Sequence, residues 1–307
     1  MASTTETDNF AARLAPVAGP AIMLLGMFMF ALNDAMGKWL VASYGLGQVV
    51  LIRSVAALLI LSPFLWHAGL KPIISAERPL MQFARVAFST GEVFCFYYAV
   101  MYLPLADVMT YWLAAPIYVA AASPLLLKEK VGWRRWTAIS FGFIGVLITL
   151  EPSSAMFTMP AIISIVGSVA FAFMLLTGRT LRGTPDKTLV FFQLLGAAIA
   201  GLIFAPFNWA PLNSSSEILL LCLLGVVAML AHMLVNRALK ISDAATVAPL
   251  QYTLLIWAII FGWMFFGDLP RTTMLVGSAL IIGSGLFIFF RERQLKARDT
   301  VLPAVPE

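Results

Sequence analysis

Few side chains in this sequence could do chemistry, and Glu92 is the best placed of them. It follows Ser89-Thr90-Gly91 inside an apolar stretch, where a charge costs about 2.5–3.5 kcal/mol to insert into a bilayer. A carboxylate in that setting could bind a solute, or take up and release a proton. The alternatives are a structural pair with Arg53 of the preceding apolar stretch, or a protonated carboxyl bonded to a neighbour. Arg53 could also extend outward to the membrane interface.

A second group of polar residues lies in the first apolar stretch. Asn33 shares a helical face with the small residues Gly26 and Gly37, which allow another helix to approach closely. The Asn33 amide could therefore bind a substrate amine or carboxylate, or form a hydrogen bond between helices. Asp34 and Lys38 are four residues apart on an adjoining face, and this spacing predicts a salt bridge near the outer interface.

One histidine and several aromatic residues complete the candidate binding residues. His232 could pack within its helix or line a cavity, and it has no second ligand three or four residues away, so we expect no metal there. Tyr98, Trp112 and Tyr252 belong to aromatic clusters that could stack on a solute or hold an amine by cation–π attraction. Gln251 places an amide beside Tyr252.

Two prolines interrupt apolar stretches, at Pro116 and Pro249. Each removes a backbone donor and leaves a carbonyl without its helical partner. We expect a kink at both positions, which would allow a helical bundle to bend. The alternative is that these prolines are tolerated without consequence, as they often are in spanning helices.

The composition requires these residues to lie in a membrane protein. Hydrophobic residues make up 61% of the chain and charged residues 11%, against about 25% charged in soluble domains. A pI of 9.4 does not indicate a nucleic-acid partner, because the basic residues lie in short runs and form no basic face. Cys95 and Cys222 have no metal-ligand spacing, and we expect neither metal nor cofactor.

Ten apolar segments are long enough to cross a bilayer as helices. They span roughly 20–40, 47–66, 81–102, 105–125, 133–150, 159–178, 188–207, 217–238, 243–266 and 272–290. No small-residue cleavage site follows the first segment, so we read it as a spanning helix rather than a signal peptide. Residues 1–19 would form a cytoplasmic N-terminal segment, and residues 291–307 a charged cytoplasmic tail with a disordered end.

The lysines and arginines predict the orientation. Of the 20 in the chain, all but Lys38, Arg53 and Arg271 fall in the N-terminal segment, the tail and every second loop. This distribution follows the positive-inside rule and supports ten spans with both termini in the cytoplasm. We therefore expect a multi-pass protein of the bacterial inner membrane.

The chain also contains a weak internal repeat at an offset of about 140 residues. Gly37-Lys38-Trp39-Leu40 is echoed by Gly178-Arg179-Thr180-Leu181, and Pro63-Phe64-Leu65-Trp66 by Pro206-Phe207-Asn208-Trp209. The repeats would occupy residues 20–150 and 159–290, with five helices each. Because five is odd, the halves would face opposite ways around a central cavity, as in many secondary transporters.

Several motifs resemble the EamA type of the drug/metabolite transporter superfamily. They are FYYAVMYLPLA at 96–106, Ala115-Pro116 leading to LLKEK at 126–130, Ala238-Leu239-Lys240, PLQYT at 249–253, and Gly262-Trp263 leading to FGD at 266–268. The family usually has Glu where this chain has Asp268. The resemblance covers nearly the whole chain and implies ten helices around a central cavity, with the fifth and tenth helices peripheral. The layout is similar to bacterial amino-acid exporters of the YddG kind.

The predicted function is export of small metabolites, most directly neutral and aromatic amino acids. Nucleosides or cationic drugs are the alternative solutes. A membrane-embedded enzyme or a channel is disfavoured, because the sequence has no P-loop, no GxSxG elbow, no paired metal ligands and no polar pore stripe. We expect a monomer, with a dimer as the alternative, whose partners are the solute and the lipid bilayer.

Overall fold

The structure, a computed structural model, describes residues 3–68, 78–126, 132–150, 158–181, 183–241 and 248–301. Within these ranges the chain is helical, and no β-strand occurs. The α-helices are α1 (Ser3–Val41), α2 (Leu46–Ala68), α4 (Pro79–Tyr102), α5 (Leu105–Leu113), α6 (Ala115–Leu126), α7 (Trp133–Leu150), α8 (Met159–Thr180), α9 (Asp186–Phe204), α10 (Ser215–Ile241), α12 (Thr253–Phe266) and α13 (Thr272–Val301). The 3-10 helices are η1 (Ala205–Asn208) and η2 (Ala248–Tyr252).

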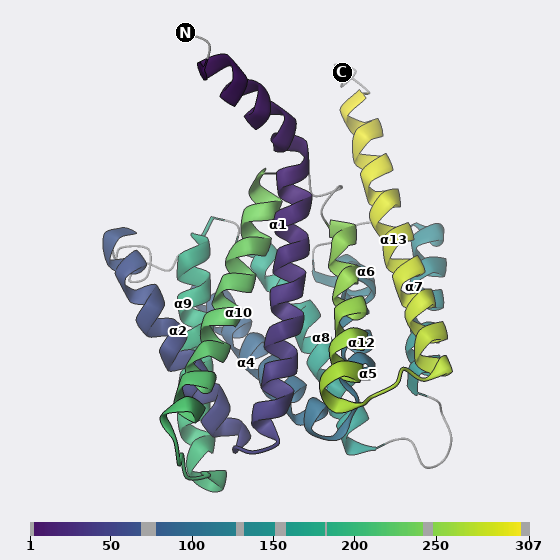
Figure 1. The fold of residues 1–307 in the computed structure, drawn as a ribbon. Helices are drawn as coiled ribbons and strands as arrows, with labels where there is room; N and C mark the ends of the chain where they lie inside the picture. Colours follow the sequence, from purple (N-terminus) through teal and green to yellow (C-terminus); the bar gives the residue numbers. More distant parts are fainter. Residues whose placement is uncertain are drawn as a thin grey trace.

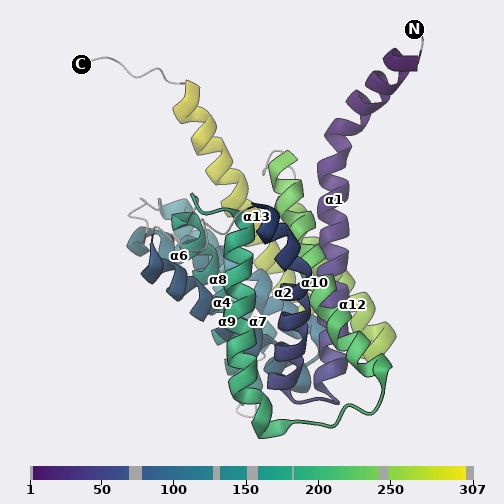
Figure 2. The same ribbon diagram turned by 90° about the vertical axis from the view of Figure 1, so that its left-hand side faces the viewer.

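The helices run alternately up and down in a single bundle, so both termini lie at the same end (Figure 1). We call this end the termini end. The opposite end, here called the far end, holds the connections 42–45, 103–104, 209–214 and 267–271. The first turns of α1 and the last turns of α13 extend beyond the bundle at the termini end (Figure 2).

The helices confirm the expected all-helical membrane class. Seven of them are long and apolar enough to cross a membrane, and two shorter apolar helices cover 136–149 and 250–266. The helix α4 is not among these, since it carries polar residues that include Arg85 and Glu92. Large apolar side chains such as Leu59, Trp66 and Ile203 are exposed on the outside of the bundle. Such a surface suits acyl chains rather than water.

Two helices extend beyond the apolar segments expected from the sequence. The first begins at Ser3 rather than near residue 20, and the last continues to Val301 rather than ending near residue 290. The turns added to α13 are rich in Arg, Glu, Gln and Lys, which favour helix in water as well as in lipid. Hydropathy therefore marks the membrane-facing part of a helix and not its full length.

Close pairing of distant helices forms the core. The most extensive pairs are α1 with α10, α4 with α8, α2 with α9, and α7 with α13. Glycines permit the tightest approaches: a methyl group on Gly225 of α10 would lie 2.0 Å from the backbone oxygen of Arg53 in α2. One large cluster of buried apolar residues runs through most of these helices.

Two of the expected segments are interrupted helices. In the segment 105–125, α5 ends at Leu113 and α6 begins at Ala115, and Pro116 is the second residue of α6. In the segment 243–266, the 3-10 helix η2 contains Pro249 and gives way to α12 at Thr253. The two interruptions are separated by about 140 residues, the offset of the sequence repeat.

Candidate functional site

Six polar and aromatic side chains from five helices meet in the interior of the bundle. We call them the interior cluster: Asp34 of α1, Arg53 of α2, Glu92 and Tyr97 of α4, Trp112 of α5, and His232 of α10. Five of the six were candidate site or pairing residues in the sequence. The bundle therefore brings together residues that lie far apart in the chain.

A hydrogen bond holds the Glu92 carboxylate in place. The Trp112 indole Nε1 donates to Glu92 Oε1 at 2.8 Å. The indole itself is buried, packs edge-on against the Phe96 ring at 5.3 Å between centroids, and lies against Gly167 of α8. Because its surroundings leave the indole little freedom, Trp112 fixes one carboxylate oxygen and leaves the other available to a ligand.

The Arg53 guanidinium is held in a similar way by Tyr97. It donates a hydrogen bond to the Tyr97 hydroxyl and lies 5.2 Å from the centre of the ring. Tyr97 is only 1% exposed and packs directly against Gly37, where a methyl group would overlap the ring. The small residue at position 37 thus makes room for the aromatic side chain that positions Arg53.

Charges of both signs face one another in the cluster. Asp34 interacts electrostatically with Glu92 and with Arg53, and Glu92 also interacts with Arg53. Arg53 is an electrostatic neighbour of Glu92, but its hydrogen bond goes to Tyr97, and the pairing of Arg53 with Glu92 stays a prediction. Asp34, Arg53, Glu92 and His232 are each half-buried, so part of every one is open to solvent. A cluster with groups of both signs suits a solute that carries both charges.

His232 lies at the side of the cluster. Its ring meets the Phe30 ring edge-on at 4.7 Å between centroids, and its electrostatic neighbours are Arg53 and Arg85. It therefore packs within the bundle and also borders the charged groups, so both of the roles considered for it have a structural basis. No group of three or more metal-ligating side chains occurs among the described residues.

Asn33 is adjacent to the cluster but is engaged elsewhere. Its amide Nδ2 donates to the backbone oxygen of Leu224 in α10 at 2.9 Å, and the side chain is 4% exposed. Of its two possible roles, the geometry supports the hydrogen bond between helices.

We therefore expect Asn33→Leu to lower the free energy of unfolding by about 0.6–1.7 kcal/mol, the range measured for such bonds in membranes. The KM for transport should stay unchanged, because the amide points at α10 and not at the solute. Thermal unfolding in detergent and transport in proteoliposomes measure the two effects, with the exposed Asn213→Leu as control. An altered KM at unchanged stability would instead make Asn33 a binding residue.

Lys38 forms its ion pair with Asp268 rather than with Asp34. The Lys38 Nζ lies 2.7 Å from Asp268 Oδ2 and donates to the Leu103 backbone oxygen at 3.1 Å. Gly267, with φ of 69°, ends α12 and turns the chain so that Asp268 reaches α1. Asp34 belongs to the interior cluster one turn away. Lys38 thus ties α1 to two connections at the far end.

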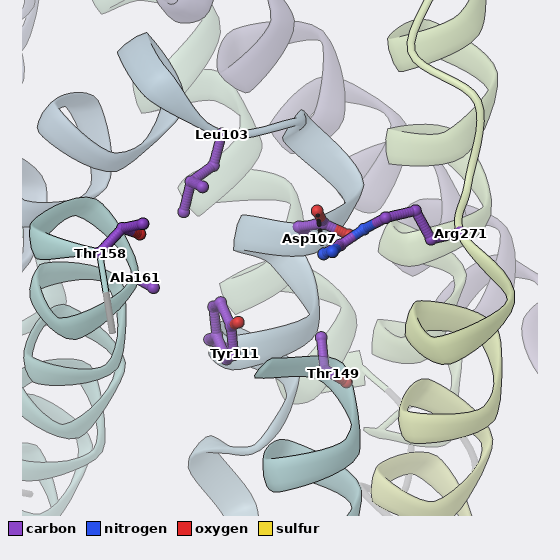
Figure 3. Close-up of a pocket in the computed structure, with 7 residues that line it drawn as sticks. All are labelled: Leu103, Asp107, Tyr111, Thr149, Thr158, Ala161 and Arg271. Atoms are coloured by element: carbon purple, nitrogen blue, oxygen red, sulfur yellow. Dashed lines mark hydrogen bonds and ion pairs between the residues drawn. The ribbon is translucent and has the colours of Figure 1, made fainter. Parts of the chain in front are cut away.

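A second ion pair at the far end borders a small cavity. Arg271 Nη2 lies 2.7 Å from Asp107 Oδ2, and Figure 3 shows the two side chains pointing toward each other from α5 and from the connection that precedes α13. The cavity measures about 210 Å³ and is also lined by Tyr111 and Thr149. It is separate from the interior cluster, since the two sites share no residue.

The remaining candidate residues lie outside the cluster. Tyr98 comes six residues after Glu92, about 120° away around the helix, and packs against Tyr102. The Tyr252 hydroxyl is directed at Gly285 of α13, and the Gln251 side chain is exposed. These three side chains are not brought together with Glu92.

Sequence reasoning passed over several residues that the structure makes prominent. Tyr97 was one aromatic residue among several, and its contact with Arg53 depends on the approach of α2 to α4. The pairs formed by Asp107 with Arg271 and by Lys38 with Asp268 join residues 164 and 230 positions apart. The spacing of residues along the sequence does not predict pairs of this kind.

Comparison with known proteins gives a consistent result over the whole chain. A family model described as the EamA-like transporter family matches residues 17–151 and again residues 158–290. A riboflavin transporter of Vibrio cholerae is 27% identical over 92% of this chain and 97% of its own length. An S-adenosylmethionine uptake transporter of Rickettsia felis is 24% identical over 90% of this chain and 93% of its own length.

An exporter and a solved structure extend the comparison. The pseudopaline exporter CntI of Pseudomonas aeruginosa is 24% identical over 86% of this chain and 93% of its own length. One crystal structure matches the fold with a TM-score of 0.60 at 14% sequence identity, covering 92% of this chain and 98% of the other. At that identity the likeness concerns the fold alone.

Proposed function

Because the chain belongs to the EamA-like transporter family, and is thus a transporter rather than an enzyme, we propose that it exports small zwitterionic metabolites by alternating access. Neutral and aromatic amino acids are the first candidates. The observation that carries this proposal is the interior cluster, which offers two carboxylates and one guanidinium in a half-buried setting.

The charges of the cluster match those of an amino acid. Asp34 and Glu92 can accept hydrogen bonds from an ammonium group, and Arg53 can donate to a carboxylate. Trp112 and Tyr97 add aromatic surface beside these charges. Nucleosides and cationic drugs would use the carboxylates and the aromatic rings but would offer no anionic group to Arg53. The named relatives include both uptake and export proteins, so export is part of our proposal.

We further propose ten spans arranged as two inverted repeats, 20–150 and 159–290. The helix contacts support a two-fold relation between the two repeats. In this relation α1 corresponds to α8, α2 to α9, α4 to α10, and α7 to α13. The interrupted segment formed by α5 and α6 corresponds to the one formed by η2 and α12. Under this relation the pair α1 with α10 maps onto α8 with α4, and the pairs α2 with α9 and α7 with α13 map onto themselves. The interruptions of the fourth and ninth segments also correspond.

Alternating access requires contacts that close one end of the bundle and then release. The two ion pairs of the far end join α1 and α5 to the connection between α12 and α13. Gln48 adds a third tie, since its amide both donates to and accepts from the Ala210 backbone at 2.9 Å. We propose that these ties close the far end and that the interrupted helices bend when they release.

The topology we propose places both termini in the cytoplasm, in a monomer of the bacterial inner membrane. Single cysteines near either end of the chain should react with a membrane-impermeant maleimide only after the membrane is permeabilised. Labelling of one end alone in intact cells would contradict the ten-span arrangement.

The proposed function is tested by transport in proteoliposomes. Purified protein should move labelled neutral or aromatic amino acids in a saturable way, and excess unlabelled amino acid should compete. The panel should include nucleosides, riboflavin and organic cations. Saturable transport of only those solutes would overturn the proposed substrate, and inside-out vesicles would establish the direction.

The ion pair of Lys38 with Asp268 gives a separate prediction. Lys38→Asp should slow transport about fivefold, because two carboxylates would then face each other at a partly buried position. Adding Asp268→Lys should restore most of the rate by restoring the attraction with its direction reversed. Initial rates in proteoliposomes measure both variants. Failure of the double exchange to recover would show that charge attraction is not what Lys38 contributes.

A further inference from the structure

We propose that Arg85 and Ser89 of α4 bind the carboxylate of the transported solute, and that Gln82 continues the same line of buried polar side chains. We call these three residues the donor row. This inference rests on the proposed function and assigns the acidic end of the solute to a place next to the interior cluster.

The donor row lies on the same face of α4 as Glu92. Gln82, Arg85, Ser89 and Glu92 are spaced by three, four and three residues, which places them in one line along a helix. Ser89 is about 4.5 Å and Arg85 about 10.5 Å from Glu92 along the axis, at 1.5 Å per residue. The row therefore leads from the termini end of α4 to the interior cluster.

Each member of the row has a buried polar atom without a hydrogen-bond partner in the structure: Gln82 Nε2, Arg85 Nε and Ser89 Oγ. Gln82 is 6% exposed and Ser89 is fully buried. A buried donor without a partner costs about 1–3 kcal/mol, and in lipid surroundings water is scarce. Three such atoms on one helical face form a set of polar groups that a ligand could satisfy.

The charge of Arg85 points to an anionic ligand. Its Nη1 donates only to the Leu189 backbone oxygen, at 3.3 Å, and no carboxylate pairs with it among the side chains that the structure describes. Arg85 and Arg53 both act electrostatically on His232, so Arg85 borders the interior cluster. An unpaired guanidinium next to an amide and a hydroxyl is a donor set for carboxylate oxygens.

The two ends of a zwitterion can then be assigned. The ammonium group would face Asp34 and Glu92, whose carboxylates only accept, while the carboxylate would face the donor row and draw on Arg85 and Ser89. The solute would thus lie along α4, with its acidic end toward the termini end. The donor row should not increase the binding affinity for a solute that lacks the carboxylate.

The test compares a solute with an analogue in which a neutral amide replaces the carboxylate, using the full chain in proteoliposomes. Arg85→Gln should raise the KM for L-phenylalanine at least about tenfold and leave the KM for L-phenylalaninamide nearly unchanged. Ser89→Ala should act in the same direction by about threefold. Arg78→Gln is the matched control, since Arg78 is the N-cap residue that precedes α4, lies outside the row and donates to the Thr180 backbone oxygen.

The outcomes separate this inference from the proposed function. An equal rise in KM for both solutes, in Arg85→Gln or in Ser89→Ala, would overturn the donor row as a carboxylate site. If Arg85→Gln does not fold, Ser89→Ala decides the question alone, because it removes only one hydroxyl. Absence of amino-acid transport in the unaltered protein would instead overturn the proposed substrate, before any variant is compared.

Discussion

Glu92→Gln is expected to slow amino-acid transport by up to about a hundredfold and to abolish any stimulation of transport by an imposed proton gradient. The glutamine oxygen can still accept the hydrogen bond from Trp112, so the side chain should keep its place. It cannot, however, offer a negative charge to an ammonium group or exchange a proton. Loss of a charge-assisted hydrogen bond costs about 1.5–3 kcal/mol, which corresponds to roughly tenfold to a hundredfold.

Initial rates in proteoliposomes, with and without an imposed pH difference, measure both effects. The matched control is Glu217→Gln, since Glu217 lies in the first turn of α10, is half-buried, and accepts from the Asn213 backbone at 2.8 Å. The control should keep the full rate and pH response. If Glu92→Gln retains an unchanged response to the gradient, Glu92 has no part in proton coupling, and its role reduces to binding or structure.

Gly225→Ala is expected to destabilise the protein by about 1–3 kcal/mol, as overpacking of a close contact does. The added methyl group would lie 2.0 Å from the Arg53 backbone oxygen, so α2 and α10 would have to separate. Because Arg53 carries the guanidinium of the interior cluster, the displacement should also slow transport. Thermal unfolding in detergent should show a Tm lower by about 2–5 °C.

Gly283→Ala provides the control for this prediction. Gly283 lies within α13, and a methyl group there would meet nothing within 4 Å. Alanine favours helix over glycine by up to about 1 kcal/mol at both positions, so only the packing differs. A Tm for Gly225→Ala equal to that of Gly283→Ala would mean that α2 and α10 do not approach as closely as described.

The contrast between these two glycines shows what a sequence can and cannot convey. Both are glycines inside apolar segments, and the sequence around them does not say which of the two faces another helix. The difference arises because Gly225 faces α2 and Gly283 faces open space, which depends on how each helix is rotated and on which helix lies next to it.

The same reasoning applies to the charged residues. The spacing of Asp34 and Lys38 correctly places them one turn apart on a helix, but it does not reveal that Asp268 reaches Lys38 from the far end. Likewise, the isolated Arg53 and Glu92 could be expected to attract each other, whereas the hydrogen bonds that hold them come from Tyr97 and Trp112. A local sequence pattern identifies the charged residues that need partners in the membrane, but it does not identify which residues those partners are.

The sequence by itself determined the membrane class, the approximate position of the helices and the family motifs. These features depend on composition and on runs of neighbouring residues, and lipid imposes helix on any long apolar run because backbone groups must be satisfied internally. Only the tertiary structure decided which side chains meet: Asn33 with the α10 backbone, Lys38 with Asp268, and the half-buried charges of the interior cluster with one another. Those contacts depend on helix rotation and on approaches between segments as much as 230 residues apart, which no local spacing encodes.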